Sequence, residues 1–365
     1  MRVTVISTVL NEGEAVRRLM DSLLAQTRQP DEIVIVDGGS RDSTVAVLQE
    51  YAGRLPLRIM VEPGANISRG RNMAIEAATS DVIASVDAGV WLEPQCLDEL
   101  TRSLEGSRFR VEGSDDLVNL QPSTLNLQHP QAVAGFFVPD VQTTFEIAMG
   151  ATVLPTADEI RPESFLPSSR SVAFTKTAWE AAGGYPEWID YCEDLIFDFR
   201  LRDVAGPFAW APEAVAHFKP RGTLKSFFKQ YYHYARGDGK ADLWRKRHMI
   251  RYVTYLIVLP GLIALGIFHS PGWWFVLLAS VMLYCATPYR RLRRRLPDLA
   301  PVERAKAVLL IPVIRAVGDV AKMPGYPAGW VWRLRNWSRA EIHWRRNAPK
   351  QKLENADSSP DASGH

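Results

Sequence analysis

A short apolar segment that ends in an aspartate constrains the fold more than any other part of this sequence. Residues Asp81–Gly89 read DVIASVDAG, an apolar run rich in β-branched residues that follows Thr79-Ser80 and ends at Ala88-Gly89. Such a run is typical of a strand buried on both faces, as inside a parallel sheet. Because ligands of open α/β sheets bind just outside the carboxyl ends of strands, Asp87 is a candidate binding residue. A helix-capping or turn role is the alternative for this aspartate taken alone.

The segments before it repeat the same pattern. Strands are expected at Val3–Val9, Glu32–Asp37 and Leu57–Val61, and helices around residues 16–24, 45–51 and 68–78. Strands that alternate with helices indicate a largely parallel α/β sheet. The sequence contains no GxGxxG motif, which excludes the dinucleotide-binding fingerprint.

Composition excludes several other classes of protein. With 365 residues, of which 47% are hydrophobic, the chain has room for a soluble domain of about 200–240 residues and a further part. A net charge of +2 gives no bulk electrostatic reason to bind nucleic acid. Cys96, Cys192 and Cys285 form no CxxC pair, so neither a zinc site nor a disulfide framework is predicted. The N-terminus does not read as a signal peptide, so we expect most of the chain in the cytosol.

Four motifs in sequence carry a resemblance to a known family. VISTVLNE at residues 5–12, EIVIVDGGSRD at residues 32–42, Arg71-Asn72 and the strand that ends in Asp87 resemble family 2 glycosyltransferases over about residues 1–240. The resemblance implies a GT-A fold, in which a Rossmann-like, mainly parallel nucleotide-binding half is fused to an acceptor half. It also implies a nucleotide-sugar donor, either a UDP-sugar or a GDP-sugar.

The same resemblance assigns donor-binding roles to individual residues. It implies that Asn11 and Glu12 lie beside the nucleoside, that Asp37 holds the base or ribose, and that Arg71 lies near the phosphates. The aspartate at the end of the central strand completes this set. For Asp42, a helix N-cap is the alternative to a site role.

The sequence departs from the family where a metal ion is usually held. The family ends its central strand in Asp-x-Asp, whereas this chain has Asp87-Ala88-Gly89 and lacks the second carboxylate. A hard cation such as Mg²⁺ or Mn²⁺ prefers oxygen ligands, and a donor diphosphate can supply several of them. We expect Asp87 to anchor such a cation weakly, with Glu93 or His217 as helpers. A partly buried structural histidine is the alternative for His217.

A pair of acids at a predicted helix start carries the chemistry. Glu193 and Asp194 follow Gly183-Gly184-Tyr185-Pro186 and precede an apolar helix face. Sugar transfer needs a base to remove the proton of the acceptor hydroxyl. The pair resembles the Glu-Asp motif of the family, which implies that Asp194 is the base of an inverting mechanism and that Glu193 contacts a sugar. Acids that only favour the helix dipole are the alternative, and Asp198 is expected to be solvated or salt-bridged.

An aromatic helix is expected at Thr223–Arg236. Gln230, His233 and Tyr234 resemble a degenerate Gln-x-x-Arg-Trp motif of processive family members, which argues against processive polymerisation. Gln230, His233 and Arg236 are expected to contact the acceptor or the leaving diphosphate. A break at residues 237–239, Gly-Asp-Gly, is expected to allow a gate.

Two apolar stretches follow the predicted catalytic domain. Tyr252–Phe268 and Gly272–Tyr289 are each just long enough to cross a bilayer of about 30 Å. Basic runs at 245–251 and 290–295 flank them, so the positive-inside rule predicts a helical hairpin with both basic ends in the cytosol. A buried helical pair in a soluble core is the alternative. The expected division is therefore a GT-A domain (1–240), a basic linker (241–251), two transmembrane helices (252–289), a cytosolic interfacial amphipathic region (290–346) and a disordered tail (347–365).

These patterns predict a membrane-anchored, inverting glycosyltransferase of the plasma or cell inner membrane, with its catalytic domain in the cytosol. A site close to the membrane suggests a lipid-linked or glycan acceptor. The alternative is a non-catalytic GT-A module that binds nucleotide or glycan within a polysaccharide assembly complex. A nucleotidyltransferase would need a glycine-rich pyrophosphate loop near the N-terminus, and the sequence has none.

Overall fold

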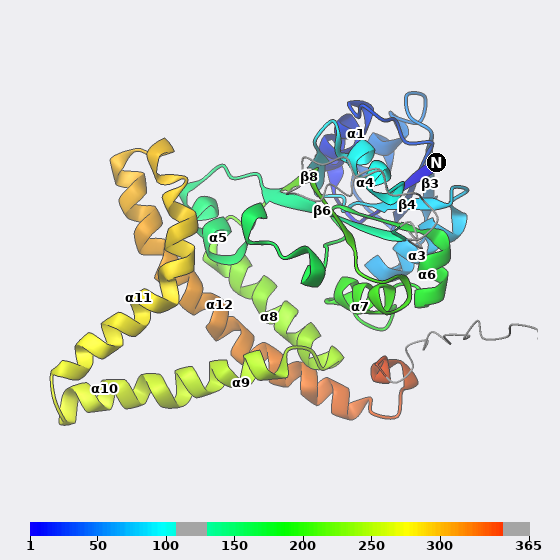
Figure 1. Ribbon diagram of the computed structural model, residues 1–365. Helices are drawn as coiled ribbons and strands as arrows, with labels where there is room; N and C mark the ends of the chain where they lie inside the picture. Colours follow the sequence, from blue (N-terminus) through cyan, green and yellow to red (C-terminus); the bar gives the residue numbers. More distant parts are fainter. Residues whose placement is uncertain (107–129, 346–365) are drawn as a thin grey trace, which may run out of the picture.

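The computed structural model describes residues 1–106 and 130–345, and a sheet of eight strands lies at its centre (Figure 1). The strand order is β3-β2-β1-β4-β7-β6-β8-β5. In chain order the strands are β1 (Val3–Val9), β2 (Glu32–Asp37), β3 (Leu57–Val61), β4 (Val82–Ser85), β5 (Val90–Leu92), β6 (Ala132–Pro139), β7 (Val172–Thr175) and β8 (Ala209–Phe218).

The four strands predicted from the start of the chain form the parallel half of the sheet. Strand β1 pairs in parallel with β2 and β4, and β2 pairs in parallel with β3. The other half is mixed, because β4–β7, β6–β7 and β5–β8 are antiparallel and only β6–β8 is parallel. Strand β5 follows Asp87 after only two residues, which leaves no room for the crossover helix that a parallel pairing with β4 would need. Four of the seven pairings between the described strands are parallel, which agrees with a mainly parallel sheet, and the antiparallel pairings all involve β5 or β7.

Helices cover both faces of the sheet, so β1, β2 and β4 are almost completely buried. One apolar core packs against α1 (Val16–Leu24), α2 (Thr44–Gln49) and α4 (Cys96–Leu104). The core on the opposite face packs against α3 (Ile67–Ala77), α6 (Lys176–Ala182) and α7 (Glu193–Ala205).

The remaining helices form a second region beside the sheet domain (Figure 1). They are α5 (Thr144–Val153), α8 (Leu224–Ala241), α9 (Arg245–Val253), α10 (Leu259–Phe268), α11 (Gly272–Arg293) and α12 (Pro301–Arg335). Helix α8 lies along α12 at very short range. A Cβ atom added to Gly329 of α12 would lie 2.1 Å from the carbonyl oxygen of Arg236, and one added to Gly239 of α8 would lie 2.3 Å from that of Tyr326. Glycine is thus required where the two backbones touch.

The predicted break at residues 237–239 is wrong. Helix α8 continues to Ala241, and Gly237 and Gly239 are buried inside it. A Cβ atom at Gly237 would lie 2.7 Å from the carbonyl oxygen of Tyr191. These glycines therefore make room for neighbouring backbone, and they do not form a hinge.

Helices α9 and α10 are joined by a π-helical turn at Thr254–Val258, and with α11 they form a hairpin that projects away from the sheet domain (Figure 1). Its two arms, Arg245–Phe268 and Gly272–Arg293, are long and apolar enough to cross a membrane. Their apolar side chains lie on the surface: Phe268 is 86% exposed, Phe275 is 76% exposed and Leu283 is 79% exposed. The alternative of a helical pair buried in a soluble core does not match this exposure.

The basic ends of the hairpin are tied to the rest of the molecule. Arg290 and Arg291 pair with Glu159, and the guanidinium of Arg294 lies 2.7 Å from a carboxylate oxygen of Asp158. Three of the basic residues that follow the second apolar stretch are therefore matched by acids in the segment after α5.

Most of the interfacial amphipathic region predicted at 290–346 is one long helix, α12. Helix α12 has 35 residues and packs one face against α8 and α5, while Leu309, Val313 and Val320 remain exposed on another. The predicted disordered tail at 347–365 lies outside the described residues.

Candidate active site

A cavity of about 670 Å³ lies between the sheet domain and α8. The sheet domain contributes Glu12, Asp87 and Gly89 to its wall, and α8 contributes Gln230, Tyr231 and Tyr234. Arg18, Arg170, Lys219 and Arg221 add four basic side chains. The lining therefore carries an excess of positive charge over its two carboxylates, as binding of a phosphorylated ligand requires.

A buried arginine joins the central strand to the helix that carries the predicted base. Nη2 of Arg71 lies 2.7 Å from Oδ1 of Asp87, and Nη1 lies 3.1 Å from Oε1 of Glu193. Burial lowers the pKa of Arg71, but the carboxylates of Asp87 and Glu193 outweigh it and hold that pKa above its usual value. Arg71 is therefore charged and paired with two acids of the protein. It is not among the residues that line the cavity.

The N-terminus of α7 places Glu193 and Asp194 together in a constrained turn. Cys192 precedes them with a φ of 68°, a left-handed conformation that side chains with a Cβ adopt at a cost. Its thiol lies 3.5 Å from the carbonyl oxygen of Tyr234, which fixes the turn against α8. The acid pair is thus positioned by contacts with a second helix.

The two acids of this turn have perturbed pKa values. Burial and the neighbouring charge of Asp194 raise the pKa of Glu193 to about 7, while Arg71 opposes the shift. Burial also raises the pKa of Asp194, and Arg71 again acts in the opposite direction. Strongly perturbed carboxyl groups are candidates for acid–base chemistry, although neither Glu193 nor Asp194 is among the residues that line the cavity.

Asp198, one turn further along α7, does not match its prediction. It is buried, its Oδ2 has no hydrogen-bond partner among residues 1–106 and 130–345, and burial raises its pKa well above the ordinary value. An apolar setting favours the neutral acid, so this side chain is neither solvated nor salt-bridged.

The predicted nucleoside-binding residues lie in two interlocked loops. Asn11 has a φ of 55°, its amide donates to Ser40 Oγ at 2.7 Å, and its side-chain oxygen accepts from the amide of Arg41 at 2.9 Å. Asp37 is buried and accepts from the amides of Gly39 and Ser40 through Oδ1, while Oδ2 has no partner in the described part of the chain. Asn11 therefore shapes the turn, and Asp37 keeps one oxygen available.

Glu12 faces the cavity that these loops border. Burial raises the pKa of Glu12, helped by Asp42 and Asp87, while Arg221 lowers it. Asp42 itself accepts from the amide of Thr44, so it supports the start of α2 although Ser43 is the N-cap residue.

Comparison with known proteins agrees with the N-terminal motifs. The profile described as glycosyl transferase family 2 matches residues 4–115. Residues 4–115 are a family 2 glycosyl transferase domain. This glycosyl transferase domain contains the parallel half of the sheet, the Asp37 turn, Arg71 and Asp87.

Relatives extend the similarity beyond that domain. The chain is 25% identical over 352 residues to the uncharacterized glycosyltransferase YibD of Escherichia coli, a match that covers 92% of this chain and 93% of the relative. It is 22% identical over 236 residues to the O-antigen chain rhamnosyltransferase RfbN of Salmonella typhimurium, covering 64% of this chain and 71% of the relative. A solved mannosyltransferase of Pyrobaculum calidifontis, in complex with GDP-Man and Mn²⁺, is 18% identical with a TM-score of 0.48, over 91% of this chain and 87% of that structure.

Of the residues predicted on α8 to contact the acceptor or the diphosphate, Gln230 lines the cavity, whereas His233 and Arg236 do not. Gln230 donates from Nε2 to the hydroxyl of Tyr234 at 2.8 Å. His233 stacks on Tyr191 at 4.9 Å, next to the turn that carries the acid pair. Burial and the charge of Arg236 lower the pKa of His233, so it is neutral at pH 7. Arg236 is half-buried and does not line the cavity.

The residues predicted to hold a metal ion are not assembled as ligands. Nε2 of His217 lies 2.9 Å from Oε1 of Glu93, and its ring stacks on Trp91 at 3.8 Å, which matches the structural alternative. Asp87 directs Oδ1 at Arg71 and has Oδ2 3.6 Å from Nε of Arg170. Among the described residues no three histidine, cysteine or acidic side chains form a group that could hold a metal. The side chains present therefore do not fit a cation held by the protein alone.

Several cavity residues were missed from the sequence. Arg170 is one of them: its guanidinium packs 4.8 Å from the ring centre of Phe218 and lies beside Asp87. Lys219 and Arg221 follow β8 directly and line the same cavity. The signal that could have found them is their position, since basic residues just after a strand end lie at the edge where ligands bind.

Proposed function

We propose that this protein is an inverting glycosyltransferase that moves a sugar from a nucleotide-sugar donor to a lipid-linked or glycan acceptor at the cytosolic face of a membrane. The donor occupies the cavity between the sheet domain and α8, with its nucleoside beside Asn11, Glu12 and Asp37. Relatives with the same N-terminal domain are named as glycosyltransferases, and one is an O-antigen chain rhamnosyltransferase.

The observation that carries this proposal is the bridge made by Arg71. It holds the end of the central strand, which family members use for the donor, against the first turn of α7, where a base is needed. Through Arg71, the helix that carries Asp194 is tied to the strand end that borders the donor cavity, which supports a base close to the donor. Catalytic groups need such fixed separation, because misplacement by about 1 Å can cost roughly a hundredfold in rate.

The proposed reaction balances with groups of this chain. The carboxylate of Asp194 takes the proton of the acceptor hydroxyl, and the acceptor oxygen forms a bond to the anomeric carbon. The bond between that carbon and the diphosphate oxygen breaks, and the nucleoside diphosphate leaves with the electron pair. Arg170, Lys219 and Arg221 stabilise the negative charge that develops on the leaving group. Glu193 orients the donor or acceptor sugar.

A divalent cation is not assigned to a protein site in this proposal. Asp87 is the acid that the family pattern supplies, and two guanidinium groups already lie beside it. Mg²⁺ or Mn²⁺ carried by the donor would find its ligands mainly on the diphosphate, which supplies charge compensation beyond that of the basic side chains.

The membrane assignment rests on the projecting hairpin. Its arms of 24 and 22 residues would be about 36 and 33 Å long, which matches a hydrocarbon core of about 30 Å. Anchoring by this hairpin would hold the cavity close to the bilayer surface and favour an acceptor that is itself membrane-linked.

Two experiments test the proposal. Purified full-length protein is screened by thermal shift against a panel of UDP- and GDP-sugars, since a ligand of the folded state raises the melting temperature. The protein is then incubated with the selected donor and a membrane extract, and release of nucleoside diphosphate is measured. Binding without turnover would favour the non-catalytic module, and absence of both would refute the proposal.

Topology is tested separately with reporters. A reporter fused after Arg295 is expected on the cytosolic side and one inserted at Ser270 on the opposite side. Reporters that both give the cytosolic signal would show that the hairpin does not cross the membrane.

A further inference from the structure

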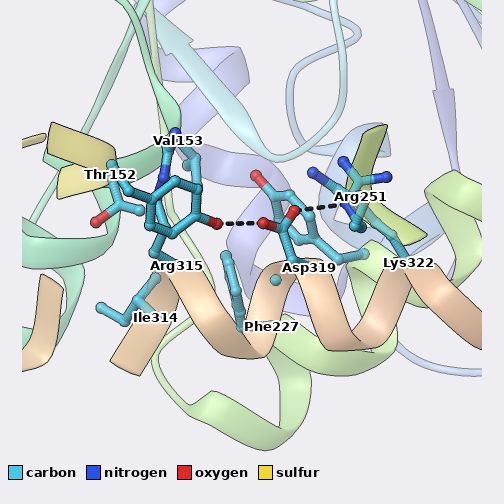
Figure 2. Close-up of a pocket in the computed structure, with 11 residues that line it drawn as sticks. Thr152, Val153, Phe227, Arg251, Ile314, Arg315, Asp319 and Lys322 are labelled. Atoms are coloured by element: carbon cyan, nitrogen blue, oxygen red, sulfur yellow. Dashed lines mark hydrogen bonds and ion pairs between the residues drawn. The ribbon is translucent and has the colours of Figure 1, made fainter. Parts of the chain in front are cut away.

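A second cavity lies in the helical region, away from the acid pair. It measures about 250 Å³ and is walled by α5, α8, α11 and α12, with Arg251 of α9 at one end (Figure 2). Ligand pockets for drug-sized molecules usually measure about 300–1,000 Å³, so this cavity is too small for a whole nucleotide sugar.

The cavity contains three cations and one carboxylate. Arg315, Asp319 and Lys322 are spaced by four and three residues on α12, which places them on one face of that helix (Figure 2). Nε of Arg251 lies 2.6 Å from Oδ1 of Asp319, and the hydroxyl of Tyr284 donates to the same carboxylate. Burial raises the pKa of Asp319, but these two partners outweigh it and keep that pKa below its usual value. Asp319 is therefore ionised and is neutralised by Arg251.

The other two cations form no ion pair in the described part of the chain, although Asp319 and Asp238 favour the charged form of Lys322 from a greater distance. Within residues 1–106 and 130–345, neither Arg315 nor Lys322 lies within ion-pair distance of a carboxylate. The guanidinium of Arg315 lies 4.3 Å from the ring centre of Tyr284, and the ammonium of Lys322 lies 4.8 Å from that of Tyr231. Nε of Arg315 is buried and has no hydrogen-bond partner in that same part of the chain.

Such an arrangement is costly without an anion. A buried donor that is left unpaired costs about 1–3 kcal/mol. Burial and the charge of Arg251 also lower the pKa of Lys322 to about 8. A bound phosphate would offer acceptors to both side chains and would favour the charged form of the lysine.

The position of the cavity indicates where such a phosphate comes from. Val153 and Tyr231 belong both to its wall and to the wall of the donor cavity, so the two spaces are neighbours. The π-helical turn after α9, together with α11 and α12, exposes apolar side chains, including Leu256, Leu283 and Leu309. A ligand with a phosphate head and an apolar tail would meet complementary surface along its whole length.

We propose that this cavity binds the phosphate group of a lipid-linked acceptor, with Arg315 and Lys322 as its ligands. The inference rests on the proposed transferase function and names the class of acceptor. The apolar tail lies along the hairpin and α12, and the phosphate position holds the acceptor next to the donor cavity.

The test uses full-length protein in detergent and three probes. Titration calorimetry is performed with farnesyl phosphate, with inorganic phosphate and with farnesol, so that the lipid and phosphate parts are separated. Farnesyl phosphate is expected to bind most tightly. Arg315→Gln and Lys322→Gln should each weaken its binding about tenfold, because each removes one charge-assisted contact.

Two sets of control variants test whether a loss of binding is specific to the cavity. Lys306→Gln and Arg335→Gln remove exposed cations of the same helix and should leave binding unchanged. Lys322→Arg keeps the charge and should retain most of the affinity, which distinguishes a lost contact from a misfolded chain. Equal loss in the exposed variants, or no loss in Arg315→Gln and Lys322→Gln, would overturn the proposal.

Donor binding in the same preparations separates this inference from the proposed function. The variants should bind the nucleotide sugar as the parent does. Phosphate-lipid binding by a protein that binds no nucleotide sugar would refute the transferase and keep the cavity as a lipid-phosphate site. Inorganic phosphate that binds as tightly as farnesyl phosphate would assign the cavity to a soluble anion and refute the lipid-linked acceptor.

Discussion

The sheet domain and the helical region deal with charge in opposite ways. At the edge of the sheet, the guanidinium of Arg71 is paired with two carboxylates, those of Asp87 and Glu193. In the helical region, Arg315 and Lys322 face a cavity with only aromatic rings as partners in the described part of the chain. Paired charges fix the geometry of a site. Buried charges without an acid partner carry a desolvation cost, which a bound anion would offset.

The two regions also differ in how they are held together. The sheet domain buries large β-branched and aromatic side chains on both faces of its strands. The crossing of α8 and α12 depends instead on glycines that let the backbones touch. The sheet domain can therefore accommodate substitutions by repacking its side chains, whereas the helix crossing has no side chain that could move at its closest contacts.

The largest effect is expected on the rate of sugar transfer, when the proposed base at the sheet edge is replaced. Asp194→Asn keeps the shape of the side chain but cannot accept a proton, so transfer should fall by roughly 10²–10⁴-fold while donor affinity stays almost unchanged. Asp198→Asn is the matched control, since a buried neutral acid resembles asparagine and transfer should persist. Rates of nucleoside diphosphate release check both variants, and near-parental turnover by Asp194→Asn would remove it from the role of base.

The second effect is expected on thermal stability, when the close contact between α8 and α12 is disturbed. In Gly329→Ala the new Cβ meets backbone of α8, at 2.1 Å from the carbonyl oxygen of Arg236. Overpacking of this kind costs about 1–3 kcal/mol, so the melting temperature should fall. Gly261→Ala in α10 is the control, because no heavy atom lies within 4 Å of its added Cβ. Equal melting temperatures for the two variants would contradict the tight crossing.

The third prediction sharpens the account of the acid pair. A rate that needs a carboxylate rises with pH through its pKa, and burial raises the pKa of Asp194, so the acid limb of kcat/KM should lie above the usual pKa range of an aspartic acid. Glu193→Gln removes a neighbouring negative charge and leaves Arg71 with one acid fewer, and both changes favour ionised Asp194. The limb should therefore move to lower pH. A pH–rate profile that stays in place would separate Glu193 from the titration of the base.

The smallest expected effect concerns the cation. Gly89 has open space around an added Cβ and no positive φ, so Gly89→Asp can restore the Asp-x-Asp pattern without strain. The extra carboxylate should tighten Mn²⁺ binding by roughly 3–10-fold and make donor binding depend more steeply on the metal. Donor titrations with and without chelator check this. Chelator-insensitive donor binding in both proteins would mean that Arg170, Lys219 and Arg221 neutralise the diphosphate without a cation.

The sequence by itself determined the parallel half of the sheet and the strand ends that matter. Strands β1, β2 and β4 are apolar β-branched runs that end in a turn or an acid, and this local pattern suffices when both faces are buried. Glu193 and Asp194 were also recognisable, because a helix start is encoded within a few residues. The two apolar arms of the hairpin follow from composition and length alone.

Tertiary structure alone decided which charges meet. Arg71 contacts Asp87 across 16 residues of sequence and Glu193 across 122, and no local pattern encodes such a pairing. The same holds for Gly237 and Gly239, whose spacing suggests a flexible break until the neighbouring backbones are seen to lie against them. His217 could be a ligand or a structural residue until its ring is found on Trp91 and its Nε2 on Glu93. Local sequence sets the backbone conformation through short-range sterics and hydrophobic period, whereas the partner of a side chain depends on long-range packing that brings distant segments together.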